Sequence, residues 1–327
     1  MLFQPKVSSL PPGIDLSGQT AVITGASAGL GLETARQLLQ LHCSTVVLAV
    51  RNVAKGKACA EKLLKDPSIK VNKPTIKVLE LDVDRNASIK AFTKTLQQET
   101  PLVHYLILNA GIARLKMERS PTGHEQSLQV NYLSNVLLLA DLLPWLNASS
   151  KETGSPTRVT WVGSRTHISM QGFEKLPPLS RAKSVLEYMD SEALFNSFSR
   201  YGDSKLLCAM FFYSLAPRLD CKKIILNMVC PGQINTDMSD FLPWYLRVVV
   251  NLQKAMRARP VEVGGWCIVN AAVVAGAEAH GKFLGDKEIL EASKYIRSPA
   301  GKEVQQHLWD ETMEEMRKLT TLPVEFS

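Results

Sequence analysis

The chain has 327 residues, 45% of them hydrophobic, and a formal net charge of +7. This length and apolar content suffice for a large core, and we expect a single domain. The basic residues are spread along the chain without a run of five or six Lys or Arg, which argues against a nucleic-acid partner and favours a basic surface that attracts an anionic cofactor.

The cysteines and the N-terminal residues indicate the cellular compartment in which the protein works. No Cys-x-x-Cys pair occurs, so we predict no metal site and expect buried thiols of a reducing compartment. The cysteines are Cys43, Cys59, Cys208, Cys221, Cys230 and Cys267. Residues 1–15 show no signal-peptide pattern, and their prolines predict an extended arm. The most apolar later run, residues 132–146, is interrupted by Asp141 and Pro144, so we predict no transmembrane segment and a soluble, cytoplasmic protein.

The first regular elements are a strand, a glycine turn and a helix. Residues 21–24 are short and apolar enough for a buried strand, and apolar residues between 32 and 39 recur at helical spacing. Gly25 permits a tight turn, Gly29 lets backbone approach a ligand, and Gly31 allows close packing of helix on strand. The helix N-terminus would then point free N–H groups at an anion. An ordinary strand-to-helix connection remains the alternative.

The second strand, residues 45–50, ends at Arg51, where a dinucleotide-binding fold places the adenosine ribose. An arginine can bind a 2′-phosphate but cannot accept a hydrogen bond from a ribose hydroxyl, so it predicts NADPH or NADP+ as cofactor. Lys55 would add a second charge, and Asn52 predicts the cap of a helix that runs to Leu64. The alternative is that Arg51 is only a surface charge.

Strands and helices alternate along the rest of the chain. Further strands are predicted at residues 75–81, 102–108, 158–162, 224–229 and 282–284. Helices are predicted at residues 86–98, within 123–146, and at 201–219, 260–276 and 299–318. This alternation indicates an α/β fold with a doubly wound parallel sheet.

Tyr201 and Lys205 are four positions apart on a predicted helix, and therefore lie on one face of it. A nearby cation stabilises phenolate and lowers the pKa of a tyrosine, which suits proton exchange with an alcohol or a carbonyl group. Such a pair also arises by chance, so alone it does not establish a site.

Other polar and small residues stand, in order, mostly at the predicted strand ends. They are Thr24, Asp82, Asn109, Ala110, Gly111, Asn131, Ser164, Pro231 and Gly232. Together with the glycine spacing and the tyrosine–lysine pair, this set resembles the short-chain dehydrogenase/reductase family over about residues 16–284. Within the family it is similar to retinol-dehydrogenase-like reductases and to fungal ketoreductases of natural-product pathways. The resemblance implies a Rossmann-type single domain over residues 16–327, with strand order 3-2-1-4-5-6-7.

The resemblance also implies roles for individual residues. Tyr201 would be the general acid or base, Ser164 would hydrogen-bond the carbonyl oxygen, and Lys205 would bind the nicotinamide ribose. Asn131 would hold a water that links Lys205 to solvent. His167 is expected to be a loop histidine, with a substrate contact as the alternative. Cofactor contacts are implied for Gly25, Ser27, Gly29, Leu30 and Gly31 in the phosphate turn, Arg51, Asn52 and Lys55 at the 2′-phosphate, Asp82 and Val83 at the adenine, Asn109 at the adjacent ribose, Ile234 and Thr236 at the carboxamide, and Ala110, Gly111, Pro231 and Gly232 beside them.

Ser164 and Tyr201 are further apart in this sequence than in the simplest family members. Two apolar inserts, near residues 165–200 and 237–258, predict either a lid over a bulky, mostly apolar substrate or a contact with a partner subunit or membrane surface. A homodimer is one assembly that this allows. The expected function is an NADPH-dependent reductase of a ketone or aldehyde, or the reverse oxidation. A nucleotide-sensing protein and a non-redox isomerase or dehydratase on the same fold are the alternatives.

Overall fold

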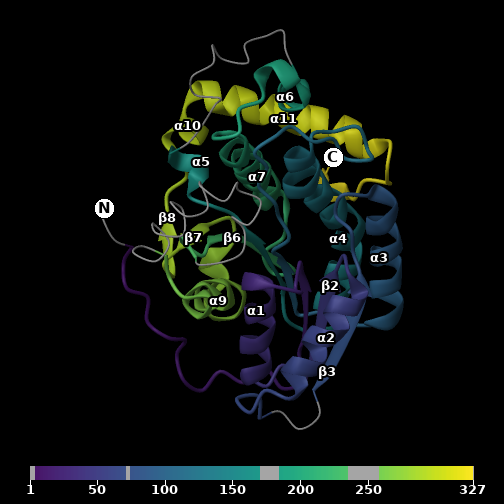
Figure 1. Ribbon diagram of the computed structural model, residues 1–327, viewed down its shortest axis with the longest axis vertical. Helices are drawn as coiled ribbons and strands as arrows, with labels where there is room; N and C mark the ends of the chain where they lie inside the picture. Colours follow the sequence, from purple (N-terminus) through teal and green to yellow (C-terminus); the bar gives the residue numbers. More distant parts are fainter. Residues whose placement is uncertain (1–3, 71–73, 170–183, 235–257, 327) are drawn as a thin grey trace.

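The computed structural model describes residues 4–70, 74–169, 184–234 and 258–326. Its centre is an eight-stranded sheet in the order β3-β2-β1-β4-β5-β6-β7-β8 (Figure 1). The strands are β1 (Thr20–Thr24), β2 (Thr45–Val50), β3 (Thr75–Glu80), β4 (Tyr105–Leu108), β5 (Thr157–Val162), β6 (Ile224–Cys230), β7 (Phe283–Gly285) and β8 (Glu288–Leu290). β8 pairs antiparallel with β7, and all other pairs are parallel.

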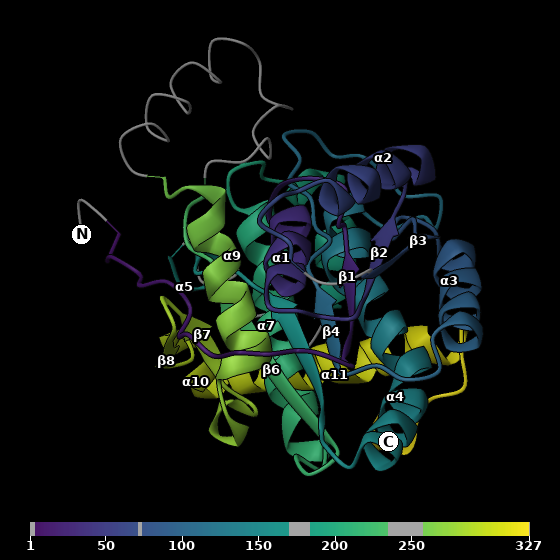
Figure 2. The same ribbon diagram turned by 90° about the horizontal axis from the view of Figure 1, so that it is seen from below.

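Helices cover both faces of the sheet (Figures 1 and 2). One face packs against α1 (Gly29–Gln40), α2 (Val53–Leu64) and α9 (Val261–Val269). The other packs against α3 (Asn86–Glu99), α4 (Ser134–Thr153) and α7 (Arg200–Leu215), with α11 (Pro299–Arg317) outside α7. Short helices are α5 (Thr166–Ser169), α6 (Val185–Asp190) and α10 (Lys294–Arg297), and π-helical segments span Leu128–Leu133 and Asn270–Val274. Strands buried on both sides need apolar residues at every position, which explains the unbroken apolar runs in the sequence.

The predicted α/β class and the strand order through β7 are confirmed. The hairpin strand β8 and the short helix α10 were not predicted, because each is too short to carry a periodic pattern. β4 begins at Tyr105, later than predicted. α4 continues to Thr153 although Pro144 lies inside it. Pro144 is exposed, and the leucines on the opposite side of α4 pack against the core, which offsets the lost backbone hydrogen bond.

The prediction of buried thiols was wrong for one cysteine. Five cysteines are buried, but Cys221 is exposed in the turn between α7 and β6, where no packing pattern extends. Among the described residues, no helix is long and apolar enough to cross a membrane.

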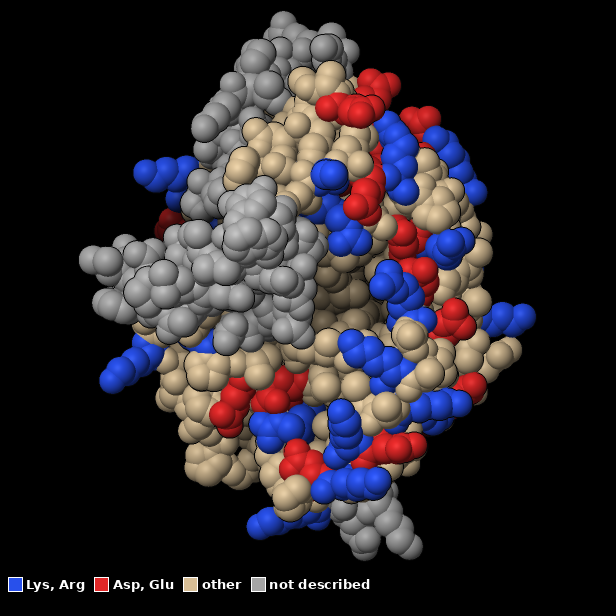
Figure 3. All heavy atoms as spheres, in the orientation of Figure 1, with Lys and Arg blue, Asp and Glu red and all other residues tan. Residues whose placement is uncertain are grey.

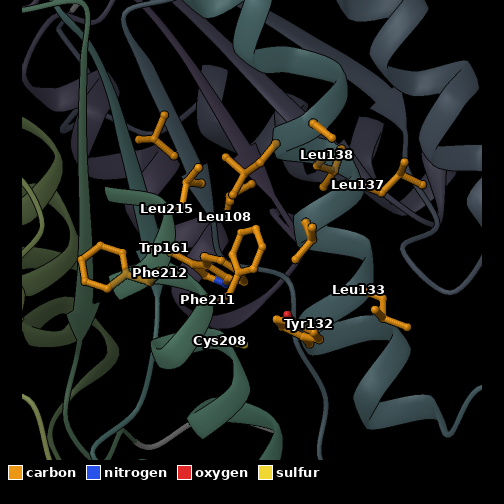
Figure 4. Packing of buried hydrophobic residues seen from close by; sticks show 14 of the residues in the cluster. Leu108, Tyr132, Leu133, Leu137, Leu138, Trp161, Cys208, Phe211, Phe212 and Leu215 are labelled. Atoms are coloured by element: carbon orange, nitrogen blue, oxygen red, sulfur yellow. The ribbon is translucent and has the colours of Figure 1, made fainter. Parts of the chain in front are cut away.

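Aromatic side chains join α7 to the sheet and to the C-terminal residues, and Figure 4 shows Phe211 of α7 beside Trp161 and Tyr132. Phe211 of α7 stacks on Trp309 of α11, with 5.2 Å between ring centroids and 18° between planes. Its edge contacts reach Trp161 of β5 at 6.4 Å and Phe326 at 5.7 Å. Such pairs add to the stabilisation that burial alone provides. The helix that carries Tyr201 and Lys205 is therefore fixed between the sheet and α11.

This packing predicts that Phe211→Ala lowers the free energy of unfolding by about 3–5 kcal/mol, because the cavity would lie where four aromatic groups meet. Phe198→Ala is the matched control, since Phe198 is 77% exposed, and should change stability by no more than about 0.5 kcal/mol. Urea denaturation followed by circular dichroism measures both. Equal stability of the two variants would contradict the aromatic cluster as a main support of α7.

Candidate active site

The turn between β1 and α1 is shaped for close approach of an anion. Gly25 has φ of +68° and Gly29 has φ of +52°, both in the region that favours glycine. A Cβ on Gly31 would lie 2.6 Å from both Asn109 Nδ2 and the Gly25 carbonyl oxygen, so only glycine fits. No side chain caps α1 at Ala28, which leaves its first amides for a ligand. These features fit the pyrophosphate of a dinucleotide; Ser27 and Leu30 lie in the same turn.

Thr24 links this turn to the end of β4. Its buried hydroxyl accepts hydrogen bonds from the backbone N–H groups of Asn109 and Ala110, each at 2.9 Å. The Asn109 side chain donates back to the Thr24 carbonyl at 2.9 Å. The strand ends therefore keep a fixed separation, and the predicted ribose contact, Asn109, lies beside the glycine turn.

The residues predicted for the adenosine end lie beyond β2 and β3. Arg51 and Lys55 are exposed, and no described carboxylate pairs with either. Asn52 caps α2 as predicted, its side chain accepting from Lys55 N at 2.9 Å. Asp82 is half-buried and accepts from Asp84 N, and Val83 follows it. The sequence thus places two unpaired cations and a carboxylate at adjacent strand ends.

Gly111, Asn131 and Lys205 meet at the end of β4. A Cβ on Gly111 would lie 3.1 Å from Asn131 Oδ1 and 3.5 Å from Lys205 Nζ. Asn131, in the π-helical segment, accepts from Ile112 N at 2.8 Å and donates to Ser204 Oγ at 2.9 Å. Its amide orientation is therefore fixed by the backbone donor and the hydroxyl acceptor.

Lys205 is almost completely buried, and its ammonium donates to the Val162 carbonyl at 3.0 Å. The same ammonium lies 5.8 Å from the centroid of the Tyr201 ring. Val162 ends β5, two residues before Ser164, so this bond holds the tyrosine–lysine helix next to the Ser164 segment. The ends of β4 and β5 and helix α7 thus converge on one cation.

In the described hydrogen bonds, the Ser164 hydroxyl is the acceptor and does not donate to another protein group. Its Oγ accepts from Thr166 N at 3.2 Å and from Thr166 Oγ1 at 2.9 Å.

The expectation that His167 lies in a loop was wrong, because His167 lies in α5, is fully buried and packs edge-on against Phe283 at 4.8 Å. Burial lowers its pKa, and its Nδ1 contacts the Ser164 carbonyl at 2.5 Å. His167 therefore stabilises the turn at Ser164 through this contact.

The turn after β6 carries the residues predicted for the carboxamide side. Pro231 and Ile234 are buried, and Gly232 has φ of +90°. Thr236 lies outside the described residues, as does most of the insert near 237–258. Figure 3 shows a hollow near the centre of the face that contains these strand ends, and Figure 1, in the same orientation, places α7 above it and α1 below it.

Two supporting hydroxyls were missed by the sequence analysis. Ser204 Oγ accepts a hydrogen bond from the Asn131 side-chain amide and donates one to the Tyr201 carbonyl at 2.8 Å. The Thr166 hydroxyl donates to Ser164 Oγ and so orients it. Ser204 stands directly before Lys205, so the signal was a hydroxyl within the tyrosine–lysine motif. The Thr166 contact crosses only two positions, but it depends on how the chain turns after β5.

The doubly wound sheet and the glycine turn at the N-terminus of α1 define a dinucleotide-binding α/β protein. A model of the short chain dehydrogenases matches residues 19–170. The chain is 60% identical over 326 residues to short chain dehydrogenase macD of Penicillium terrestre, covering 99% of this chain and 98% of that protein. It is 59% identical over 325 residues to short-chain dehydrogenase/reductase tropG of Talaromyces stipitatus, with the same coverages. The protein belongs to the short-chain dehydrogenase/reductase family. It is an oxidoreductase of this family.

Solved structures show the same fold at low identity. The Pseudomonas aeruginosa RhlG/NADP active-site complex is 22% identical, with a TM-score of 0.64, covering 84% of this chain and 97% of that chain. The L-sorbose reductase from Gluconobacter frateurii, complexed with NADPH and L-sorbose, is 17% identical, with a TM-score of 0.61, covering 83% of this chain and 96% of that chain.

The hydroxyl of Thr24 gives a prediction for the site's framework. Thr24→Val keeps the side-chain shape but leaves the Ala110 N–H without its described acceptor and the Asn109 N–H with only the Ile107 carbonyl at 3.1 Å. It should lower the free energy of unfolding by about 1–3 kcal/mol. Thr100→Val is the control, because the buried Thr100 hydroxyl has no partner among the described residues, and should be neutral or stabilising. Thermal unfolding compares them, and a Thr24→Val protein as stable as the control would contradict this role.

Proposed function

We propose that the protein uses NADPH to reduce a ketone or aldehyde of a bulky, mostly apolar substrate to an alcohol, or catalyses the reverse oxidation with NADP+. The observation that carries this proposal is the buried Lys205 ammonium, held between the Val162 carbonyl and the Tyr201 ring. This places a phenol and an ammonium side by side, the pair of groups that the sequence analysis singled out for proton exchange with an alcohol or a carbonyl group. When bound, the nicotinamide supplies or accepts the hydride.

The protein's own residues would handle the proton and the carbonyl oxygen. Tyr201 would give its phenolic proton to that oxygen during reduction and take it back during oxidation. Because Ser164 Oγ already accepts from Thr166, its own hydroxyl proton is available for a hydrogen bond to the same oxygen. Asn131 Oδ1 accepts one described hydrogen bond and so keeps one lone pair for a water beside Lys205.

Arg51 and Lys55 support a preference for the phosphorylated cofactor. Both side chains are exposed at the end of β2 and have no described carboxylate partner. A guanidinium binds phosphate with two parallel N–H groups, while a ribose hydroxyl would offer it little. Gly25, Gly29 and Gly31 would hold the pyrophosphate against the first turn of α1.

Exposed apolar side chains near the proposed site support a large apolar substrate. Phe198 and Leu194, shortly before Tyr201, are 77% and 38% exposed, and Ile168, shortly after Ser164, is 39% exposed. The aromatic residues of the two inserts named in the sequence analysis lie in part outside the described residues. We also place this chemistry in secondary metabolism, as the sequence resemblance implies, and whole-length matches to fungal dehydrogenases support that placement.

The other candidates are a nucleotide sensor and a non-redox enzyme on the same fold. A sensor has no use for a phenol held beside a buried ammonium, and the geometry around Lys205 therefore counts against it. Loss of NADPH absorbance with a panel of small and large ketones separates the proposed reductase from both alternatives. Oxidation of NADPH by large ketones supports the proposal, while binding without turnover of any carbonyl compound would favour the sensor.

Tyr201→Phe should bind NADPH as the parent does but lose hydride transfer. The change removes one hydroxyl and keeps the ring, so turnover should fall by about 10²–10⁴-fold. Tyr213→Phe, on the same helix, is the matched control and should keep parental turnover. Steady-state assays with a ketone that the parent reduces provide the measurement. Turnover of Tyr201→Phe within about tenfold of the parent would reject Tyr201 as the proton donor.

Arg51→Asp should shift cofactor preference from NADPH toward NADH, because it replaces a phosphate-binding group with an acceptor for ribose hydroxyls. The loss should be about 1.5–3 kcal/mol of NADPH binding. Lys62→Asp, an equal charge change in the last turn of α2, controls for the general effect of net charge. Fluorescence titration with both cofactors measures the dissociation constants. Equal weakening of NADPH by the two variants would show that Arg51 is only a surface charge.

A further inference from the structure

An aspartate outside the proposed catalytic set bridges two arginines. Asp286 Oδ2 lies 2.6 Å from Arg165 Nη2, and its Oδ1 lies 2.5 Å from Arg259 Nη1. The Arg259 side chain is 8% exposed and that of Asp286 is 11% exposed. Burial raises the pKa of Asp286, but the hydrogen bonds and charges of the two arginines outweigh it and lower the pKa below its usual value. The carboxylate is therefore charged and shared by two segments.

The turn that presents Asp286 is strained. Asp286 and Lys287 connect β7 to β8 with φ of +55° and +70°, the geometry of a two-residue hairpin turn that favours glycine or asparagine. An aspartate tolerates this region, but a lysine there costs free energy. Replacing a buried ion pair by apolar residues often stabilises a protein, so neither the turn nor the charges are explained by stability alone.

Each arginine belongs to a segment of the proposed site. Arg165 directly follows Ser164, and its backbone N–H donates to Cys230 Sγ at 3.3 Å. Arg259 forms an isolated parallel bridge with Ile234, and its backbone N–H donates to the Gln233 carbonyl at 2.9 Å. Asp286 thus connects the Ser164 segment to the turn of residues 231–234.

The N-terminal arm holds the same turn from its other side. The side-chain amide of Gln4 accepts a hydrogen bond from Gln233 N and donates one to Gln233 O, both at 2.8 Å. It thus pairs with the backbone of Gln233 as a residue of a neighbouring strand would. Arg259 Nη2 also donates to the Pro5 carbonyl at 2.5 Å. A Cβ on Gly232 would collide with Gln4 Oε1 and lie 2.8 Å from Arg259 Nη1, so only glycine lets the arm and the arginine close on this turn.

We propose that Asp286 and Gln4 are positioning residues for the cofactor: they hold residues 231–234, where the nicotinamide end would bind, in a fixed relation to Ser164. This inference rests on the proposed function, because it takes residues 231–234 as the nicotinamide side of the site and Ser164 as the residue that binds the carbonyl oxygen. Neither residue contacts the reacting atoms. Asp286 acts through Arg165 and Arg259, and Gln4 acts through the backbone of Gln233.

Asp286→Asn tests the charge without disturbing the turn, since asparagine also tolerates positive φ. The variant should raise the dissociation constant of NADP+ about tenfold and lower kcat for a ketone by at least about tenfold, because geometry at the reacting atoms governs that rate. Asp310→Asn, an exposed aspartate of α11, is the control and should leave both values unchanged. An Asp286→Asn protein with NADP+ affinity and kcat within twofold of the parent would overturn the inference.

Gln4→Ala supplies a second test if Asp286→Asn does not fold, because Gln4 is half-exposed on an arm without helix or strand. It frees the Gln233 N–H, so hydrogen–deuterium exchange at Gln233 should accelerate at least about tenfold, and the dissociation constant of NADP+ should rise about three- to tenfold. Lys6→Ala, exposed on the same arm, should change neither. Faster exchange with unaltered NADP+ affinity would overturn the positioning role and leave only a structural contact.

These readouts separate this inference from the proposed function. NADP+ affinity and amide exchange are measured without turnover, so they test the positioning role even if no carbonyl compound is reduced. Parental turnover with unaffected Asp286→Asn and Gln4→Ala variants would leave the proposed function intact and reject the inference alone.

Discussion

The burial of the Lys205 ammonium is the constraint on which the site depends. A buried cation is costly unless polar groups surround it, and here the Val162 carbonyl provides the described hydrogen bond. That bond requires α7 to lie across the end of β5. The close approach of Gly111 then brings the end of β4 to the same point. The sheet order and the helix packing are therefore fixed where the chemistry would occur, and the aromatic contacts of Phe211 hold the other end of α7.

Asn131 lies where the backbone departs from regular α-helix. The π-helical segment Leu128–Leu133 widens one turn, a feature that is frequent at functional sites. The Asn131 carbonyl accepts from Asn135 Nδ2 at 2.9 Å and from Cys208 Sγ at 3.1 Å, so side chains replace backbone donors there. Its own amide binds Ile112 and Ser204. The widened turn thus directs one side chain between β4 and α7.

Signals that act over a few residues allowed much of this structure to be predicted. The glycine turn, the Asn52 cap and the strand order each follow from local spacing or from the alternation of elements. What the sequence could not show depends on distant partners. Gln4 and Gln233 are 229 positions apart, and the buried His167 packs against Phe283, which β7 supplies from more than 100 positions further along the chain. Neither loop position of the strained hairpin, Asp286 or Lys287, is a glycine or an asparagine, so the usual turn signal is missing.

The two ends of the proposed cofactor site rest on different physics. At the phosphate end, closely spaced glycines and the first turn of α1 supply backbone amides, so the binding groups are built into one short stretch of chain. At the nicotinamide end, residues 231–234 depend on three other segments of the chain. The Gln4 side chain and the Arg259 backbone bind Gln233, and Asp286 holds the Arg259 side chain. Backbone geometry tolerates most substitutions elsewhere, whereas a charged bridge fails when one partner is lost. Changes far from the reacting atoms should therefore affect the geometry of hydride transfer more than the retention of the pyrophosphate.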